Sequence, residues 1–254
     1  MNTIFHNKLV AIGKHTLNPV GFVAYALLCL LRGQVDLREF IRHLYRFIYG
    51  VFPIVLMACI GVGGVVALQG LEYVARYNAS EVFGWAAGLS AFRDVAPLLL
   101  SFVLANAVGA RNTAELLAWR AQAGEVSFKA LGIHTFRIIE GPRLFALTVA
   151  ALLLYPIAVV ATLVSAIVFA GMVGDQNVYA SFYSIYHYVP LAILGAGLLR
   201  LGCFGFLIGV FSVYFARTQR FDPLSVGKGV GRAAAISTLL ICILNFVLTA
   251  LETL

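Results

Sequence analysis

Charged residues are scarce in this sequence. Only 11% of its residues are Asp, Glu, Lys or Arg, whereas a soluble domain usually carries about a quarter. Hydrophobic residues make up 61% of the 254-residue chain. So little charge excludes an ordinary soluble globular protein, and so much apolar surface excludes a disordered one. The composition therefore predicts an integral membrane protein.

Motifs for catalysis and for metal or nucleotide binding are also lacking. The four cysteines lie in apolar stretches without CxxC spacing, which indicates small buried side chains rather than metal ligands or disulfides. The five histidines form no HExxH motif, and GxSxG does not occur. Gly227-Lys228-Gly229 lacks the spacing of a phosphate-binding P-loop. We therefore expect no catalytic site, no cofactor and no metal in this chain.

Long runs with few charges are what the sequence does contain. A helix that crosses a bilayer needs about 20 mainly apolar residues, because hydrocarbon offers no water to an unpaired backbone group. Five segments meet this condition, namely 48–71, 87–110, 144–173, 190–215 and 233–252. The sequence therefore predicts an all-α integral membrane fold with five transmembrane helices.

An earlier apolar run, residues 15–31, is shorter and contains Pro19 and Gly21. No small-x-small cleavage site follows it, which argues against a signal peptide. We expect an N-terminal helix that lies in the membrane interface, with a sixth, very short span as the alternative. Residues 1–46 are accordingly predicted to form a cytoplasmic, interfacial segment, followed by a membrane domain over residues 47–254.

Basic residues are distributed unevenly along the chain. Of the 18 Lys and Arg residues, six lie in residues 1–46, five in 111–143 and four in 217–232. Because loops rich in Lys and Arg stay on the cytoplasmic side, these segments are predicted to be cytoplasmic. The N-terminus is then inside and the C-terminus outside. The net charge of +7 is thereby explained without a nucleic-acid partner.

The predicted cytoplasmic loop 111–143 is long and has mixed charge. Thr113 followed by Glu115 and an apolar stretch indicates a helix start with an acid in its first turn. A helix here, parallel to the membrane, could dock onto a soluble partner. The alternative is a plain connector, although connectors are usually shorter.

Polar side chains inside predicted spans are costly and are therefore candidates for function. Arg93 and Asp94 are adjacent in the second span, Arg200 lies in the fourth and Asn245 in the fifth. Simpler roles are open for each of them. Arg93 and Asp94 could neutralise each other at the interface, Arg200 could extend its side chain to the interface, and Asn245 could bond a neighbouring helix.

Small residues recur in two of the spans. Glycines cluster between Gly61 and Ala67 in the first span and between Gly195 and Gly209 in the fourth. Small residues at such spacing let helices approach closely in lipid. We expect them to serve helix packing.

Five short motifs resemble those of one family of membrane proteins. Residues 64–70 resemble GxVxxLQG, 93–97 resemble RELGP, 105–115 resemble AGRxGSAxTAE, 142–143 match PR, and 245–251 resemble DFVLTAL. The matches keep order and spacing from about residue 50 to the end of the chain. In these residues the chain is similar to the MlaE/YrbE permeases, the membrane subunits of MCE-type lipid ABC transporters.

The resemblance implies a permease subunit without enzymatic activity of its own. It implies a homodimer in the bacterial inner membrane, with a phospholipid cavity that opens toward the periplasm. A periplasmic MCE-domain protein would cap the cavity, and a separate cytosolic ABC ATPase would supply the energy. A cytoplasmic coupling helix, from about Glu115 to Leu131, would sit in a groove of that ATPase.

The resemblance also implies site residues at matching positions. The lipid pocket would be lined by Val66, Gln69, Tyr73, Val74 and Tyr77. The polar positions of the cavity fall on Arg93, Asp94, Arg200 and Asn245. Contacts with the ATPase would come from Glu115, Arg120, Gln122, Ala123, Gly124 and Glu125.

The chain departs from the family pattern at several of these positions. The Glu-Gln pair that is usual in the coupling helix is Ala123-Gly124 here, which puts the strength or mode of ATPase docking in question. Asn245 stands in place of an acid, while Arg200 stands in place of a lysine. Losing one acid leaves the predicted cavity one charge more positive. We therefore expect a preference for an anionic headgroup, which Arg can grip with two hydrogen bonds.

Two other functions remain as alternatives. The missing Glu-Gln pair is compatible with a lipid-binding scaffold that assembles MCE partners without transporting lipid. A secondary transporter with its own ion site would need paired acids in broken helices near the midplane. Asp94 is the only acid inside a predicted span apart from Glu252 at its extreme end, so the sequence offers little for that reading.

Overall fold

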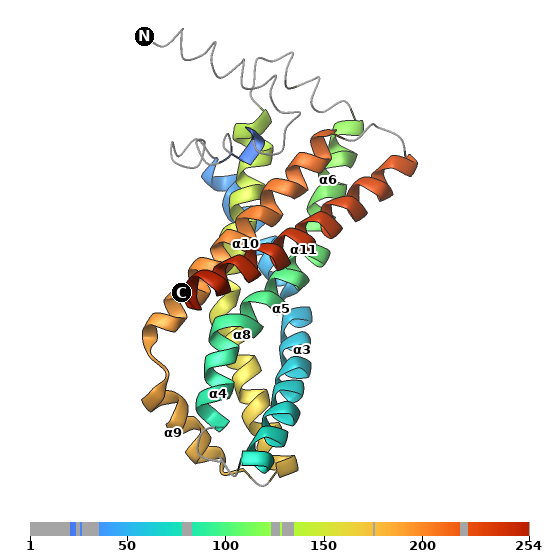
Figure 1. Cartoon of the computed structure of the whole chain (residues 1–254). Coiled ribbons are helices and arrows are strands. Elements are labelled where there is room, and N and C mark those ends of the chain that lie inside the picture. Colours follow the sequence, from blue (N-terminus) through green and yellow to red (C-terminus); the bar gives the residue numbers. More distant parts are fainter. Residues whose placement is uncertain are drawn as a thin grey trace, which may run out of the picture. The chain divides into compact units, whose positions relative to one another are not determined.

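The computed structural model describes residues 21–23, 26, 36–77, 83–122, 128, 135–174, 176–218 and 223–253. Over these residues every regular element is helical, and none is a strand. The elements are α3 (Leu37–Tyr77), α4 (Phe83–Ser90), η2 (Ala91–Val95), α5 (Ala96–Val103), η3 (Leu104–Gly109), α6 (Ala110–Ala121), η4 (Phe136–Glu140), α8 (Gly141–Gly174), α9 (Val178–Tyr188), α10 (Leu191–Thr218) and α11 (Pro223–Thr253). The prediction of an all-α fold is confirmed (Figure 1).

Five helical segments of the described chain are long and apolar enough to cross a membrane. They are Leu37–Arg76, Phe83–Ala121, Ile138–Gly174, Ala192–Thr218 and Val226–Glu252. The predicted five-span architecture is therefore confirmed. Most segments run further than the predicted spans, because a helix does not stop where an apolar run meets its first charge. Thus α3 begins at Leu37, well before the predicted start at residue 48.

The second of these segments is built from α and π turns in succession. It runs through α4, η2, α5 and η3 into α6. The predicted helix start at Thr113 is therefore wrong, because the helix already begins at Ala110. The Thr113 hydroxyl donates backward to the carbonyl of Gly109 (2.9 Å). This back-bonding within a helix satisfies a side chain that a sequence reader would assign to a cap.

An additional short helix, α9, connects α8 to α10. The side chain of Asn177 caps its start by accepting hydrogen bonds from the backbone N–H groups of Tyr179 (3.0 Å) and Ala180 (3.3 Å). The helix packs closely on α4, because a Cβ added at Gly84 would lie 2.2 Å from the carbonyl oxygen of Ser181. The sequence interpretation had left this stretch as a loop.

The described chain divides into two compact units. Unit 1 comprises Met1–Phe47, Ala105–Val149 and Phe206–Leu239, and unit 2 comprises Ile48–Leu104, Ala150–Gly205 and Leu240–Leu254. Their arrangement follows from the long helices, of which several begin in one unit and end in the other. Each unit has its own packing.

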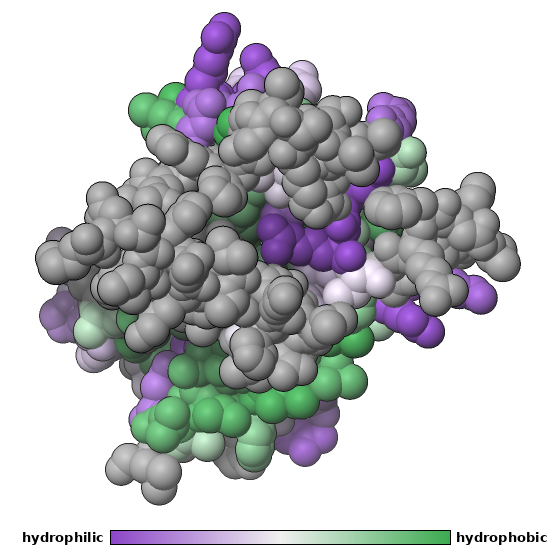
Figure 2. All heavy atoms as spheres, turned by 90° about the horizontal axis from the view of Figure 1, so that it is seen from above, coloured by the Kyte–Doolittle hydropathy of each residue, from purple (hydrophilic) through white to green (hydrophobic). Residues whose placement is uncertain are grey.

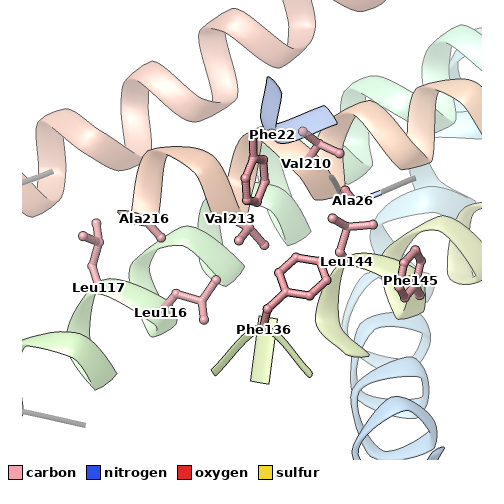
Figure 3. Close-up of a cluster of buried hydrophobic side chains, with 10 residues drawn as sticks. All are labelled: Phe22, Ala26, Leu116, Leu117, Phe136, Leu144, Phe145, Val210, Val213 and Ala216. Atoms are coloured by element: carbon pink, nitrogen blue, oxygen red, sulfur yellow. The ribbon is translucent and has the colours of Figure 1, made fainter. Parts of the chain in front are cut away.

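Unit 1 is held together by one cluster of buried apolar side chains (Figure 3). The cluster gathers residues of α6, η4, α8 and α10, together with residues near the N-terminus: Phe22, Ala26, Leu116, Leu117, Phe136, Leu144, Phe145, Val210, Val213 and Ala216. Beside it, the nearly buried carboxylate of Glu140 pairs with Arg217, whose Nε donates to Oε1 over 3.0 Å. Figure 2 views the chain from the top of Figure 1, and on that face hydrophilic and hydrophobic residues form separate groups.

Unit 2 contains the close helix packing that the glycine clusters predicted. A Cβ added at Gly63 of α3 would lie 1.8 Å from Oγ of Ser165 and 2.5 Å from the carbonyl oxygen of Thr162, both on α8. A glycine is required there because α8 occupies that space. Gly61, two residues earlier, has no atom within 4 Å of such a Cβ. The small residues of the first span therefore pack helices at Gly63 but not at Gly61.

The predicted N-terminal interfacial helix falls largely outside the described residues, which include only 21–23 and 26 of it. That expectation stays a prediction.

The two glycines allow a matched test of this packing. Gly63→Ala should lower the free energy of unfolding by about 1–3 kcal/mol, because the new methyl group meets backbone as well as side chain on α8. Gly61→Ala should change it by about 1 kcal/mol or less, since the methyl group enters open space. Denaturant unfolding of the purified variants in detergent measures both, and equal effects would contradict the α3–α8 contact.

Candidate functional site

A pocket opens in unit 2 between α3 and α4. Its cavity volume is about 330 Å³, and its lining includes Val66, Gln69, Gly70, Tyr73, Val74, Phe83, Ala86, Ala87, Ser90 and Val95. The residues from α3 recur every three or four positions, so that they form one face of the helix. The first two turns of α4 and the π turn η2 supply the opposite wall. We call this cavity the α3–α4 pocket.

The wall of the α3–α4 pocket is mainly apolar, with polar groups at Gln69, Tyr73 and Ser90. Such a wall suits a hydrocarbon chain, while a few polar groups can orient what is bound. Four of the five residues predicted to line a lipid pocket, Val66, Gln69, Tyr73 and Val74, lie together here. Their role as lipid ligands remains a prediction. The side chain of Tyr77 is outside the described part of the structure.

A second hollow in unit 2 lies between α3 and α8. It is larger, about 680 Å³, and its lining includes Leu56, Ile60, Pro156, Ile157, Val160, Ala161, Val164, Ser165, Val168 and Phe169. This α3–α8 groove is almost wholly apolar and several of its side chains are well exposed. Exposed apolar side chains on a membrane-crossing helix are the surface that acyl chains of the bilayer cover. The groove lacks the polar groups that would orient a headgroup.

A network of charged side chains joins η2, α10 and α11 in unit 2. Its centre is Arg200 of α10, which is 1% exposed and pairs with Asp94 of η2. The other end of the same guanidinium, Nη2, lies 2.8 Å from Oε2 of Glu252 on α11. The same carboxylate oxygen lies 2.8 Å from Nε of Arg93. Two arginines and two carboxylates thus meet in one place.

Two uncharged side chains complete this arginine network. Nη1 of Arg200 donates to Oδ1 of Asn245 (3.1 Å) and to the hydroxyl of Thr249 (3.3 Å). The Thr249 hydroxyl in turn donates to Asp94 (3.4 Å). Asn245, Thr249 and Glu252 follow one another at four and three positions along α11 and therefore share one face of the helix. The C-terminal part of α11 is attached to unit 2 through this face.

The local helix geometry places the two charged neighbours of η2. Arg93 and Asp94 lie in a five-residue π turn, Ala91–Val95, between α4 and α5. A π turn contains an extra residue, which alters the direction of the side chains around it and is common at functional sites. Ser90 and Val95, on either side of the pair, line the α3–α4 pocket. The pocket and the arginine network therefore adjoin the same turn.

The structure brings together all four predicted polar residues and decides between their simpler roles. Arg200 does not extend toward the interface, since its side chain is buried among the groups it pairs with. Arg93 and Asp94 have different partners, Glu252 and Arg200 respectively, so mutual neutralisation does not describe them. Asn245 does bond a neighbouring helix, through Arg200.

Sequence reasoning missed Glu252 and Thr249. The expectation of one surplus positive charge is wrong, because Glu252 joins the network and balances the second arginine. Glu252 follows Asn245 by seven residues, which is two helical turns, so both face the same side of α11. This spacing was the available signal, but the position near the chain end directed attention away from it.

The residues predicted to contact an ATPase are in unit 1, where the structure shows two of them in intramolecular contacts. Glu115 of α6 accepts hydrogen bonds or ion pairs from three arginines: Arg46 (2.9 Å), Arg111 (3.1 Å) and Arg143 (3.4 Å). Arg120 donates to the carbonyl oxygen of Ala216, near the end of α10 (2.6 Å). We call the first group the Glu115 hub.

The remaining coupling residues are only partly covered. Gln122 is the residue with which this described stretch ends, and Ala123, Gly124 and Glu125 fall outside it. Contacts of these positions with an ATPase stay predictions. Within the described residues, no group of three or more His, Cys, Asp or Glu side chains could hold a metal ion.

Comparisons with known proteins agree over most of the chain. A family profile described as Permease MlaE matches residues 40–251. A probable ABC transporter permease protein of Rickettsia felis is 27% identical, over 95% of this chain and 96% of its own length. A probable ABC transporter permease protein of Synechocystis is 25% identical, over 87% and 84%. The intermembrane phospholipid transport system permease protein MlaE of Haemophilus influenzae is 24% identical, over 55% of this chain and 56% of its own length.

The arginine network predicts a large stability effect at one position. Arg200→Met should lower the free energy of unfolding by about 2–3 kcal/mol, because Asp94 and Glu252 lose their shared partner; this is less than for fully buried carboxylates, since both are about a third exposed. Arg76→Met, which breaks an exposed pair with Glu72, should cost about 0.5 kcal/mol or less. Denaturant unfolding in detergent compares the two, and equal losses would show that the network does not hold α11.

Proposed function

Because the chain belongs to the MlaE family of ABC transporter permeases, we propose that it moves phospholipid between the inner membrane and a periplasmic MCE-domain protein. A separate cytosolic ATPase would supply the energy. One observation carries the proposal: an apolar pocket and a network of opposite charges adjoin the same π turn, η2. A phospholipid has the same division, with apolar chains joined directly to a charged headgroup.

The α3–α4 pocket would hold acyl chain. Burying a CH₂ group from water contributes about 0.8 kcal/mol. A lipid that arrives from the bilayer, however, exchanges one apolar surrounding for another, so the net energy of binding is much smaller. A modest approach of α4 toward α3 would then be enough to expel the chain. The name of the Haemophilus influenzae relative, which includes intermembrane phospholipid transport, supports phospholipid as the cargo.

The Glu115 hub would pass force from the ATPase to the membrane helices. Its ion pairs connect α6 with Arg46 of α3 and Arg143 of α8. A push on the segment after α6 would therefore reach two spans through one carboxylate. In this proposal the coupling segment lies within 111–143, residues 1–46 form the cytoplasmic interfacial segment, and 47–254 form the permease domain. The basic segments face the cytoplasm, and the end of α11 faces the periplasm.

We expect the working unit to be a homodimer. Large apolar side chains on α11, including Leu239, Ile243 and Phe246, are more than half exposed. In the assembled transporter such a face is covered by lipid or by the second copy. The exposed face supports an assembly without deciding which of the two covers each residue.

Neighbouring residues on α3 test the pocket directly. Val66 lines the α3–α4 pocket, whereas Val65 is 50% exposed. Val66→Trp should reduce the phospholipid retained by the purified protein by about tenfold, because the indole fills space that a chain would occupy. Val65→Trp should leave it unchanged. Quantitative mass spectrometry of extracted lipid measures both.

The same variants distinguish a transporter from a passive scaffold. With its ATPase partner, a permease should stimulate ATP hydrolysis in a lipid-dependent manner, and Val66→Trp should abolish that dependence while Val65→Trp keeps it. A stable complex without any ATPase partner, or with an ATPase whose turnover ignores the permease, would favour the lipid-binding scaffold. Equal lipid retention by both variants would contradict the assignment of the pocket.

A further inference from the structure

Glu252 is a carboxylate in an unfavourable position unless something holds it there. It lies in the last turn of α11, where the helix dipole disfavours negative charge. It is also two-thirds buried on a helix that crosses the membrane. The two arginines supply the compensation, since one oxygen of Glu252 lies 2.8 Å from Nε of Arg93 and 2.8 Å from Nη2 of Arg200.

The geometry of this contact matches that of a phosphate oxygen. Guanidinium groups bind carboxylate and phosphate through the same pattern of N–H donors, and such charge-assisted bonds are the strong ones. An oxygen shared by two guanidiniums is therefore the position that a lipid phosphate would also take. Glu252 and a phosphate compete for the same donors.

The rest of the network allows that exchange. Arg200 keeps Asp94, Asn245 and Thr249 as partners when Glu252 leaves. Glu252 is 33% exposed and belongs to the last turn of its helix, where ends fray at little cost. The carboxylate can thus withdraw while the buried arginine stays in place.

Charge balance then determines which headgroup fits. The network holds Arg93, Arg200, Asp94 and Glu252, two charges of each sign. A zwitterionic headgroup keeps this balance, because its phosphate takes the arginines and its ammonium takes the released carboxylate. An anionic headgroup leaves one negative charge without a partner where the dielectric constant is low, which is unfavourable.

On the proposed function, from which this inference starts, we propose that Glu252 is the specificity-determining residue of the headgroup site. It exchanges with the lipid phosphate and thereby selects zwitterionic phospholipids over anionic ones. The preference resides in the balance of charge and not in the shape of the pocket. Moving or removing the one acid therefore changes the preference in a direction that can be stated beforehand.

The test uses the full-length protein, purified in detergent and incubated with equal amounts of phosphatidylethanolamine and phosphatidylglycerol. Mass spectrometry gives the ratio of the two lipids that the protein retains. The unchanged protein should retain more phosphatidylethanolamine. Glu252→Gln should shift the ratio about tenfold toward phosphatidylglycerol, because the network then carries one surplus positive charge. Glu72→Gln, which removes an exposed acid on α3, should leave the ratio as it was.

A second variant restores the balance at another position. Asn245 already contacts Nη1 of Arg200, so Asn245→Asp combined with Glu252→Gln returns one acid to the network. This double variant should recover the original ratio. The recovery also guards against misfolding, since a variant that only damages the protein lowers retention of both lipids and is not rescued in its ratio.

The outcomes separate the two levels of the proposal. An unchanged ratio in Glu252→Gln, with lipid still retained, overturns the role of Glu252 and leaves the proposed function standing. A shifted ratio that Asn245→Asp does not restore also overturns it, because charge balance is then not the cause. A protein that retains neither phospholipid contradicts the proposed function itself, and with it this inference.

Discussion

A guanidinium inside a membrane must be neutralised, and the fate of Arg200 organises the membrane half of this molecule. Its side chain is almost fully buried, and leaving it unpaired would cost far more than any single apolar contact contributes. The partners therefore have to come from whichever helices can reach it. The π turn η2 supplies Asp94, and α11 supplies Asn245, Thr249 and Glu252. The attachment of α11 to α10 and the irregularity of the second span both follow from this requirement.

The same requirement explains why the pocket and the charges are neighbours. The π turn that aims Arg93 and Asp94 at α10 and α11 also carries Val95, which with Ser90 helps to form the wall of the α3–α4 pocket. A shift of this turn moves both. In a permease, such a link means that contact with a headgroup and contact with a chain cannot change independently. Unit 1 shows the same economy, with Glu115 of α6 pairing with arginines of α3 and α8.

The sequence predicted most of the fold, because five apolar runs of sufficient length allow few other structures in a bilayer. It also predicted the positions of Val66, Gln69, Tyr73 and Val74 around one pocket, through a resemblance that is carried by spacing along one helix face. Three features could not be obtained in this way. Thr113 has the composition of a cap but lies inside a helix, since only the preceding π turn η3 keeps that helix continuous. The packing of α9 on α4 depends on contact between Gly84 and Ser181, residues far apart in the chain. Glu252 was overlooked because charge was counted by motif, whereas an arginine is neutralised by whatever lies within reach.

The central claim is that phospholipid binds with its chain in the α3–α4 pocket and its headgroup at the arginine network. The most direct measurement uses two photoreactive phosphatidylethanolamines, one with the reactive group on the acyl chain and one with it on the headgroup, followed by peptide mapping of the crosslinks. The chain probe should label residues of α3 and α4 around Val66 and Ala87, and the headgroup probe should label η2 and the end of α11. Labelling of the α3–α8 groove around Ile60 and Val164 by both probes, without labelling of the pocket, would contradict the account.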